Sequence, residues 1–132
     1  KIASKLIKKF FIENSREITL YGNGKNLIDM MYVQDAIDWV ILACKQKFKN
    51  ETVDFGVASP ITIKELVERI AIICGVHNAI INFDTETSPK EDYYFRLGEA
   101  WFRPKTPFNY EFKYSLESGI LLLKDWLVKN GG

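Results

Sequence analysis

Apolar residues in this chain change repeatedly between helical spacing and strand-like alternation. Over residues 3–14 they recur three or four positions apart, as on one face of a helix. Over residues 17–21 they alternate, with Ile18 and Leu20 on one side, as in a half-buried strand. Helical spacing returns over 35–48, 62–75 and 115–130, and strand patterns appear over 53–57 and 79–83. This order predicts a small α/β fold of about four helices and a few short strands, too few for a doubly wound sheet.

Several predicted helix boundaries have recognisable residues. Thr62 and Glu65 form a capping box, in which each side chain accepts a hydrogen bond from a backbone N–H group at the helix start. Asp35 and Ser115 fit the N-cap position of two other helices. Gly75 suits the left-handed conformation that ends many helices. These residues place four of the helix ends.

The helix predicted over 35–48 has an apolar stripe, typical of a helix that packs one face on a core. The stripe consists of Ile37, Val40, Ile41, Cys44 and Phe48. Before this helix, Gly22-Asn23-Gly24 predicts a tight turn, because glycine and asparagine tolerate positive φ. Residues 84–109 form a polar and aromatic stretch that is too long for an ordinary connection.

Composition excludes some classes of function. The 132 residues are enough for one domain or a piece of a larger one, with 47% hydrophobic and 27% charged residues. The formal net charge of +1 gives no polyanion-binding surface, so we expect no nucleic-acid partner. No apolar run approaches the roughly 20 residues of a membrane-spanning helix. The sequence starts at Lys1 without an initiator methionine, so we interpret it as beginning inside a longer chain.

Metal and thiol chemistry are not expected. We interpret Cys44 and Cys74 as buried free thiols in a reducing cytosol, because both lie in apolar helical stretches. His77 has no second histidine and no cysteine pair for a metal site, so we interpret it as a solvated loop residue. Asp35 and Asp38 are the closest carboxylate pair on a helix face and are interpreted as solvated charges, with Asp35 capping the helix.

The chain also lacks the common catalytic and cofactor motifs. No glycine-rich fingerprint opens a strand–helix–strand unit, so no cradle for a dinucleotide pyrophosphate is expected. Only Tyr21 is followed four residues later by a lysine, Lys25, and the Gly22-Asn23-Gly24 turn lies between them, so this pair is not placed on one helix face. There is no G-x-S-x-G motif. We therefore expect no catalytic, cofactor-binding or metal-binding residue in this chain.

Five segments, in order, resemble the motifs of one family. The segments are 18–25 (ITLYGNGK), 29–36 (DMMYVQDA), 54–56 (DFG), 61–66 (ITIKEL) and 113–120 (KYSLESGI). They are similar to segments of the NAD(P)-dependent nucleotide-sugar epimerases and dehydratases, which are extended short-chain dehydrogenases. Each motif alone is weak, but five in the right order are specific. The resemblance covers almost the whole chain and identifies it with the carboxy-terminal part of that family.

The resemblance implies a parent protein of two parts. An amino-terminal Rossmann domain would hold NAD or NADP and the Tyr-x-x-x-Lys catalytic pair. Residues 1–132 would be the substrate-binding carboxy-terminal portion, an α/β subdomain that lacks its Rossmann domain and closes over a nucleotide sugar. The intact enzyme would be a cytoplasmic homodimer resembling a UDP-glucose 4-epimerase. Alone, this chain is expected to bind no cofactor and to catalyse nothing.

The resemblance also implies substrate-binding residues. Thr19 and Tyr21 correspond to residues along the base, where an aromatic ring can stack. Lys25, Arg96 and Arg103 would neutralise the diphosphate. The sequence departs from the family at Ile28, where an arginine is expected.

Two alternatives stay open. A threonine-dehydrogenase-like oxidoreductase of the same superfamily lacks the diphosphate arginine, and Met30-Met31-Tyr32 is similar to its segment. The Gly22-Asn23-Gly24 turn argues against it. A non-catalytic binding or interaction module is the second alternative.

Overall fold

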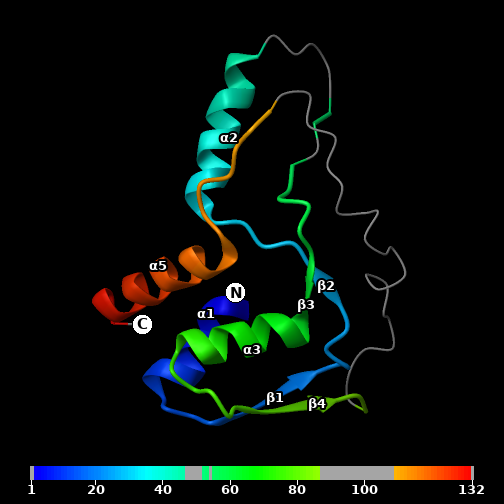
Figure 1. Cartoon of the computed structure of the whole chain (residues 1–132), viewed down its shortest axis with the longest axis vertical. Coiled ribbons are helices and arrows are strands. Elements are labelled where there is room, and N and C mark those ends of the chain that lie inside the picture. The colour runs from blue at the N-terminus through cyan, green and yellow to red at the C-terminus, as the bar shows by residue number, and fades with distance from the viewer. Residues whose placement is uncertain (1, 47–51, 54, 87–108, 132) are drawn as a thin grey trace.

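The chain folds into a small α/β structure, and its computed structural model describes residues 2–46, 52–53, 55–86 and 109–131 (Figure 1). The predicted fold class is confirmed. The helices are α1 Ile2–Ile7 with its continuation η1 Lys8–Ile12, α2 Val33–Lys45, α3 Ile63–Ile73 and α5 Leu116–Lys129. The strands are β1 Glu17–Tyr21, β2 Leu27–Ile28, β3 Ile61–Thr62 and β4 Ile80–Asp84. None of the described helices is long and apolar enough to cross a membrane.

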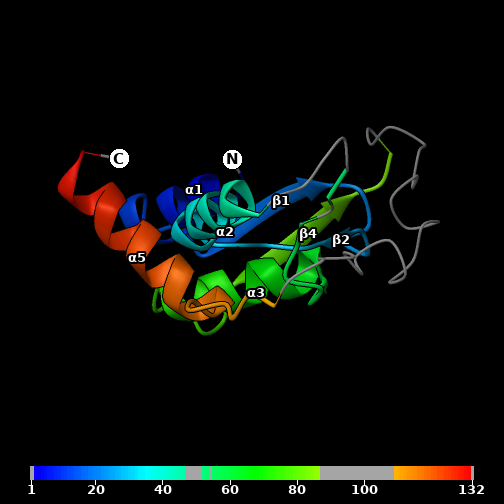
Figure 2. The same cartoon turned by 90° about the horizontal axis from the view of Figure 1, so that it is seen from above.

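The strands form two separate pairs. β1 and β4 are parallel, from Glu17 opposite Ile80 to Tyr21 opposite Asp84, and lie side by side in both views (Figures 1 and 2). β2 and β3 are antiparallel and short, with Ile28 opposite Ile61. The strands predicted over 17–21 and 79–83 are confirmed, the second with a shift of one residue. The strand predicted over 53–57 is wrong, because the described residues of that stretch form none.

Three helices build the core. Leu6, Ile7 and Phe10 of the first helix are fully or almost fully buried. They pack with the apolar faces of α3 and α5, in a cluster that includes Leu66, Val67, Ile70, Ile120 and Leu127. The apolar spacings that predicted these faces are confirmed. Burying a large aliphatic side chain contributes about 1.5–3 kcal/mol each, so this cluster holds the fold together.

The predicted ends of α3 are also confirmed. The Thr62 hydroxyl accepts a hydrogen bond from the Glu65 backbone N–H at 3.1 Å, and the Glu65 carboxylate accepts one from the Thr62 N–H at 2.8 Å. The Glu65 carboxylate also accepts a hydrogen bond from the Thr62 hydroxyl at 2.9 Å, and the backbone and side-chain bonds that it accepts from Thr62 hold the pKa of Glu65 below its usual value. Gly75 follows the helix with a φ of 83°, as expected for a left-handed end.

The prediction that Asp35 caps α2 and is solvated is wrong. The N-cap position belongs to Tyr32, and Asp35 lies inside the first turn with no exposed surface. Its carboxylate accepts hydrogen bonds from the Tyr110 hydroxyl at 2.9 Å, the Lys113 N–H at 3.0 Å and the Tyr114 N–H at 3.1 Å. Asp35 therefore fastens α2 to the segment that leads into α5, which runs beside this helix in Figure 1.

The apolar stripe predicted for α2 does not face a core. Ile37, Val40, Ile41 and Cys44 are all exposed, and Phe48 lies outside the described residues. The opposite side of the helix is buried instead, where the Trp39 ring stacks on Phe55 at 4.2 Å between centroids. The burial expected of Cys44 is therefore wrong. Cys74 is half-buried, and burial raises the pKa of its thiol.

Candidate functional site

A groove of about 620 Å³ runs between α1 and the outer edge of β1. Thr19 and Tyr21 line it, both are exposed, and Tyr21 keeps 77% of its surface accessible. β4 covers one edge of β1, so within the described residues the other edge has backbone N–H and C=O groups with no strand opposite them. The groove thus combines a free strand edge with an exposed aromatic ring, which suits a flat polar ring such as a nucleobase.

Two lysines from α1 and η1 line the same groove. Lys5 is exposed, and Lys9 forms an ion pair with Glu13 at 2.9 Å. Because Glu13 already neutralises part of the Lys9 charge, Lys5 is the more available cation. Sequence reasoning missed both lysines, although their spacing of four residues places them on one helix face. The groove therefore has a positive side for a phosphate group opposite its strand edge.

Lys25, also predicted to bind substrate, does not line this groove. Lys25 borders a separate groove of about 500 Å³ between the Gly22-Asn23-Gly24 turn and α3, with Lys64 and Glu68. Arg96 and Arg103 lie outside the described residues. The structure thus brings Thr19 and Tyr21 together and places Lys25 elsewhere.

The Gly22-Asn23-Gly24 turn adopts the predicted conformation, and Phe83 packs against one of its glycines. Gly22 and Gly24 have φ values of 89° and 72°. A Cβ atom on Gly24 would lie 2.5 Å from the Phe83 ring, so the space above this glycine is filled by a side chain. A dinucleotide pyrophosphate needs glycines open to its oxygens. The turn leads into β2 and not into a helix, so it is not the glycine-rich cradle of a dinucleotide-binding unit, and the sequence contains no other.

Tyr110 is the buried phenol nearest a carboxylate, and its chemistry is structural. Burial, followed by the hydrogen bond to Asp35, raises the pKa of Tyr110 to about 12. The phenol therefore stays protonated at neutral pH and donates a hydrogen bond to Asp35. A catalytic base must accept a proton near the working pH, so Tyr110 does not fit that role.

Ile28 belongs to the framework of the fold. It pairs with Ile61 in the β2–β3 ladder and packs, half-buried, against the hydrophobic core. It does not line the groove beside β1. At the position where the family has an arginine, this chain thus has an isoleucine that makes apolar contacts with the core.

Replacing Ile28 by arginine should destabilise the chain. Ile28→Arg places a charge against the core, with an expected loss of about 1–3 kcal/mol in the free energy of unfolding. Urea denaturation would measure it, with Thr19→Arg on the exposed face of β1 as a control that should change stability by less than about 0.5 kcal/mol. Unchanged stability together with tighter binding of UDP would contradict this placement of Ile28.

Comparison with known proteins supports the resemblance seen in the motifs. No protein-family model matches the chain. A curated relative, Probable GDP-L-fucose synthase 1 of Oryza sativa subsp. japonica, is 27% identical over 131 residues, covering 95% of this chain and 38% of that protein. The chain thus spans well under half the length of the relative it matches.

Solved structures share the fold. One is a dTDP-glucose 4,6-dehydratase from Bacillus anthracis in complex with NAD, with a TM-score of 0.73 and 21% identity over 98% of this chain and 40% of that one. Another is a UDP-glucose 4-epimerase from Thermotoga maritima with UDP-glucose, with a TM-score of 0.73 and 20% identity over 100% of this chain and 40% of that one. The predicted resemblance is therefore confirmed: the chain shares its fold with these nucleotide-sugar enzymes and is similar in sequence to the GDP-L-fucose synthase, over a part of their length.

Proposed function

We propose that this chain is the substrate-binding portion of an NAD(P)-dependent nucleotide-sugar epimerase or dehydratase, and that the groove beside β1 holds the nucleoside diphosphate. The observation that supports this is the grouping of a free strand edge, Tyr21 and Lys5 around one groove. The base would lie along the strand edge and stack on the Tyr21 ring. The diphosphate would lie toward Lys5, whose ammonium binds phosphate as a point charge.

The reaction itself would take place on residues outside this chain. NAD or NADP, when bound by the parent enzyme, would supply hydride transfer. The glycine turn of this chain leads into a strand and not into a helix, so the residues of the chain would orient the nucleotide and not the cofactor. The remaining length seen in the relatives would supply the cofactor-binding domain, with the parent acting as a cytoplasmic homodimer.

A threonine-dehydrogenase-like function is the second candidate. The position of Ile28 favours it, because an isoleucine packed on the core offers no charge to a diphosphate. Lys5 favours the nucleotide, since a phosphate needs a cation whereas a zwitterionic amino acid carries its own, and Lys9 is already paired with Glu13.

Titration of the 132-residue chain with nucleotides tests the proposal. Chemical-shift changes caused by UDP or GDP should fall on α1 and β1, and Tyr21→Ala should weaken binding about tenfold, or about 1–1.5 kcal/mol for a lost stack. Trp126→Ala is the matched control, because Trp126 is also exposed and lies outside the groove. Lys5→Gln should weaken binding of UDP but not of uridine, whereas Lys8→Gln should change neither. Shifts with threonine alone, or nucleotide shifts away from β1, would overturn the proposal.

A further inference from the structure

A second, polar pocket of about 250 Å³ lies away from the groove beside β1. It sits where the chain enters β1 and β4, between the end of η1 and the turn after α3. Its walls include Asn14, Arg16, Cys74, Val76, His77 and Asn78. The two cavities share no lining residue, so this pocket is separate from the proposed nucleotide site.

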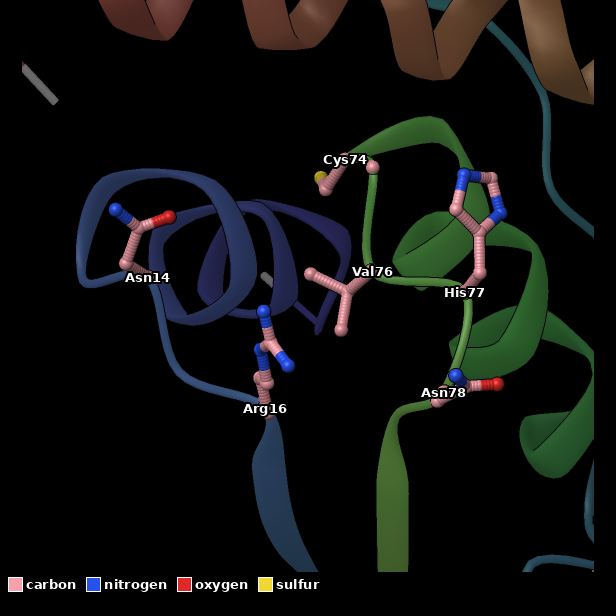
Figure 3. A pocket seen from close by; sticks show the side chains of 7 residues that line it. Asn14, Arg16, Cys74, Val76, His77 and Asn78 are labelled. Carbon is pink, nitrogen blue, oxygen red and sulfur yellow. The ribbon is translucent and has the colours of Figure 1, made fainter.

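Arg16 is the group that gives this pocket its chemistry. Figure 3 shows its guanidinium pointing into the space between the two turns, toward Cys74 and Val76, whereas the His77 and Asn78 side chains point away. The carboxylates nearest in sequence are engaged elsewhere: Glu13 pairs with Lys9 at 2.9 Å and Glu17 accepts from the Asn82 amide at 2.7 Å. Within the described residues Arg16 has no ion pair, so its donors are available to a ligand.

A second cation reinforces the positive charge. Lys124 donates to the Ile73 carbonyl at 3.5 Å, at the end of α3, and its charge opposes the upward shift that burial gives the pKa of Cys74. The carboxyl ends of two helices, η1 and α3, also reach this region, and each carries roughly half a negative charge. Arg16 is the only arginine or lysine among the described residues that line the pocket, Lys124 lies beside it at the end of α3, and no carboxylate is among those lining residues.

We propose that this pocket binds a small oxyanion of the phosphate type. The Arg16 guanidinium would bind two oxygens at once, because its planar fork matches their spacing. Asn14 lines the pocket from the same turn as Arg16, with a φ of 53°, and its side-chain amide would be a second donor. Such a site is separate from the nucleotide groove. An anion bound here would link the end of η1 to the turn after α3, and it would contact the chain before β1 but not the strand itself.

Titration with inorganic phosphate at constant ionic strength tests this site. In ¹⁵N–¹H spectra of the 132-residue chain, the amides of residues 14–16 and 74–78 should shift and saturate, and Arg16→Gln should weaken binding at least about tenfold. Arg69→Gln is the matched control: it removes a guanidinium that pairs with Glu117 at 2.7 Å, outside the pocket, and should leave binding unchanged. Non-saturating shifts, or equal binding by Arg16→Gln and the wild type, would overturn the proposal. Shifts confined to α1 and β1 would mean that phosphate occupies only the nucleotide groove, and would overturn it as well.

Discussion

Asp35→Ala should lower the free energy of unfolding by about 3–5 kcal/mol. The substitution removes a fully buried carboxylate that accepts three hydrogen bonds, and leaves the N–H groups of Lys113 and Tyr114 without their acceptor. An unsatisfied buried polar group costs about 1–3 kcal/mol, and hydrogen bonds to a charged acceptor are the stronger ones. Since small domains are stable by only about 5–15 kcal/mol, this loss would be a large share of the total. Urea unfolding followed by circular dichroism would measure it.

Asp38→Ala is the control on the same helix. Asp38 pairs with Lys113 at 2.7 Å, but the Lys113 side chain is 62% exposed. The hydrogen bond from Lys113 lowers the pKa of Asp38, yet solvent screens an exposed pair, and its loss should cost far less than that of the buried network. Asp35→Asn should fall between the two, because an amide keeps one acceptor oxygen. Equal losses for Asp35→Ala and Asp38→Ala would show that the buried network does not hold α2 in place.

The sequence predicted the parts of the fold that depend on local pattern. The capping box at Thr62 and Glu65, the glycine at the end of α3 and the alternation of β1 are properties of neighbouring residues, and all three are present. β2 and β3 were not predicted, because a strand of two residues is too short to show periodicity. Their pairing depends on Ile28 meeting Ile61, a contact between distant parts of the chain.

The role of Asp35 could not be predicted from the sequence either, because it also depends on contacts between distant parts of the chain. An aspartate near a helix start has the local appearance of an N-cap. Its actual partners are 75 to 79 residues away, and only the tertiary fold brings them to it. The candidate groove was predicted in part: motif order pointed to Thr19 and Tyr21. Lys5 and Lys9 belong to α1 and η1, whose packing against β1 no motif specified.

The exposed stripe of α2 should make the isolated chain self-associate. Val33 and Val40 keep 61% and 51% of their surface accessible, and Ile37 and Ile41 are similarly exposed. The opposite side of the helix is buried through Trp39 and Asp35. A helix that is apolar on both sides normally lies between two layers of protein. We therefore propose that in a protein of the relatives' length the additional domain covers this stripe, and that a second copy of the chain takes its place when that domain is missing.

Sedimentation velocity over a range of concentrations would measure this association. Ile37→Lys combined with Ile41→Glu keeps the net charge and should make the chain monomeric, while stability changes by less than about 0.5 kcal/mol because both side chains are exposed. Leu121→Lys with Val128→Glu on α5 is the matched control, since these residues are 45% and 52% exposed on another helix. Association should persist in that control if the α2 stripe is the contact surface. A wild-type chain that stays monomeric at every concentration would contradict the prediction, because exposed apolar patches of this kind seldom persist without a partner. Equal loss of association in both double variants would instead place the contact on α5 as much as on α2, and the covering domain would then have to reach both helices.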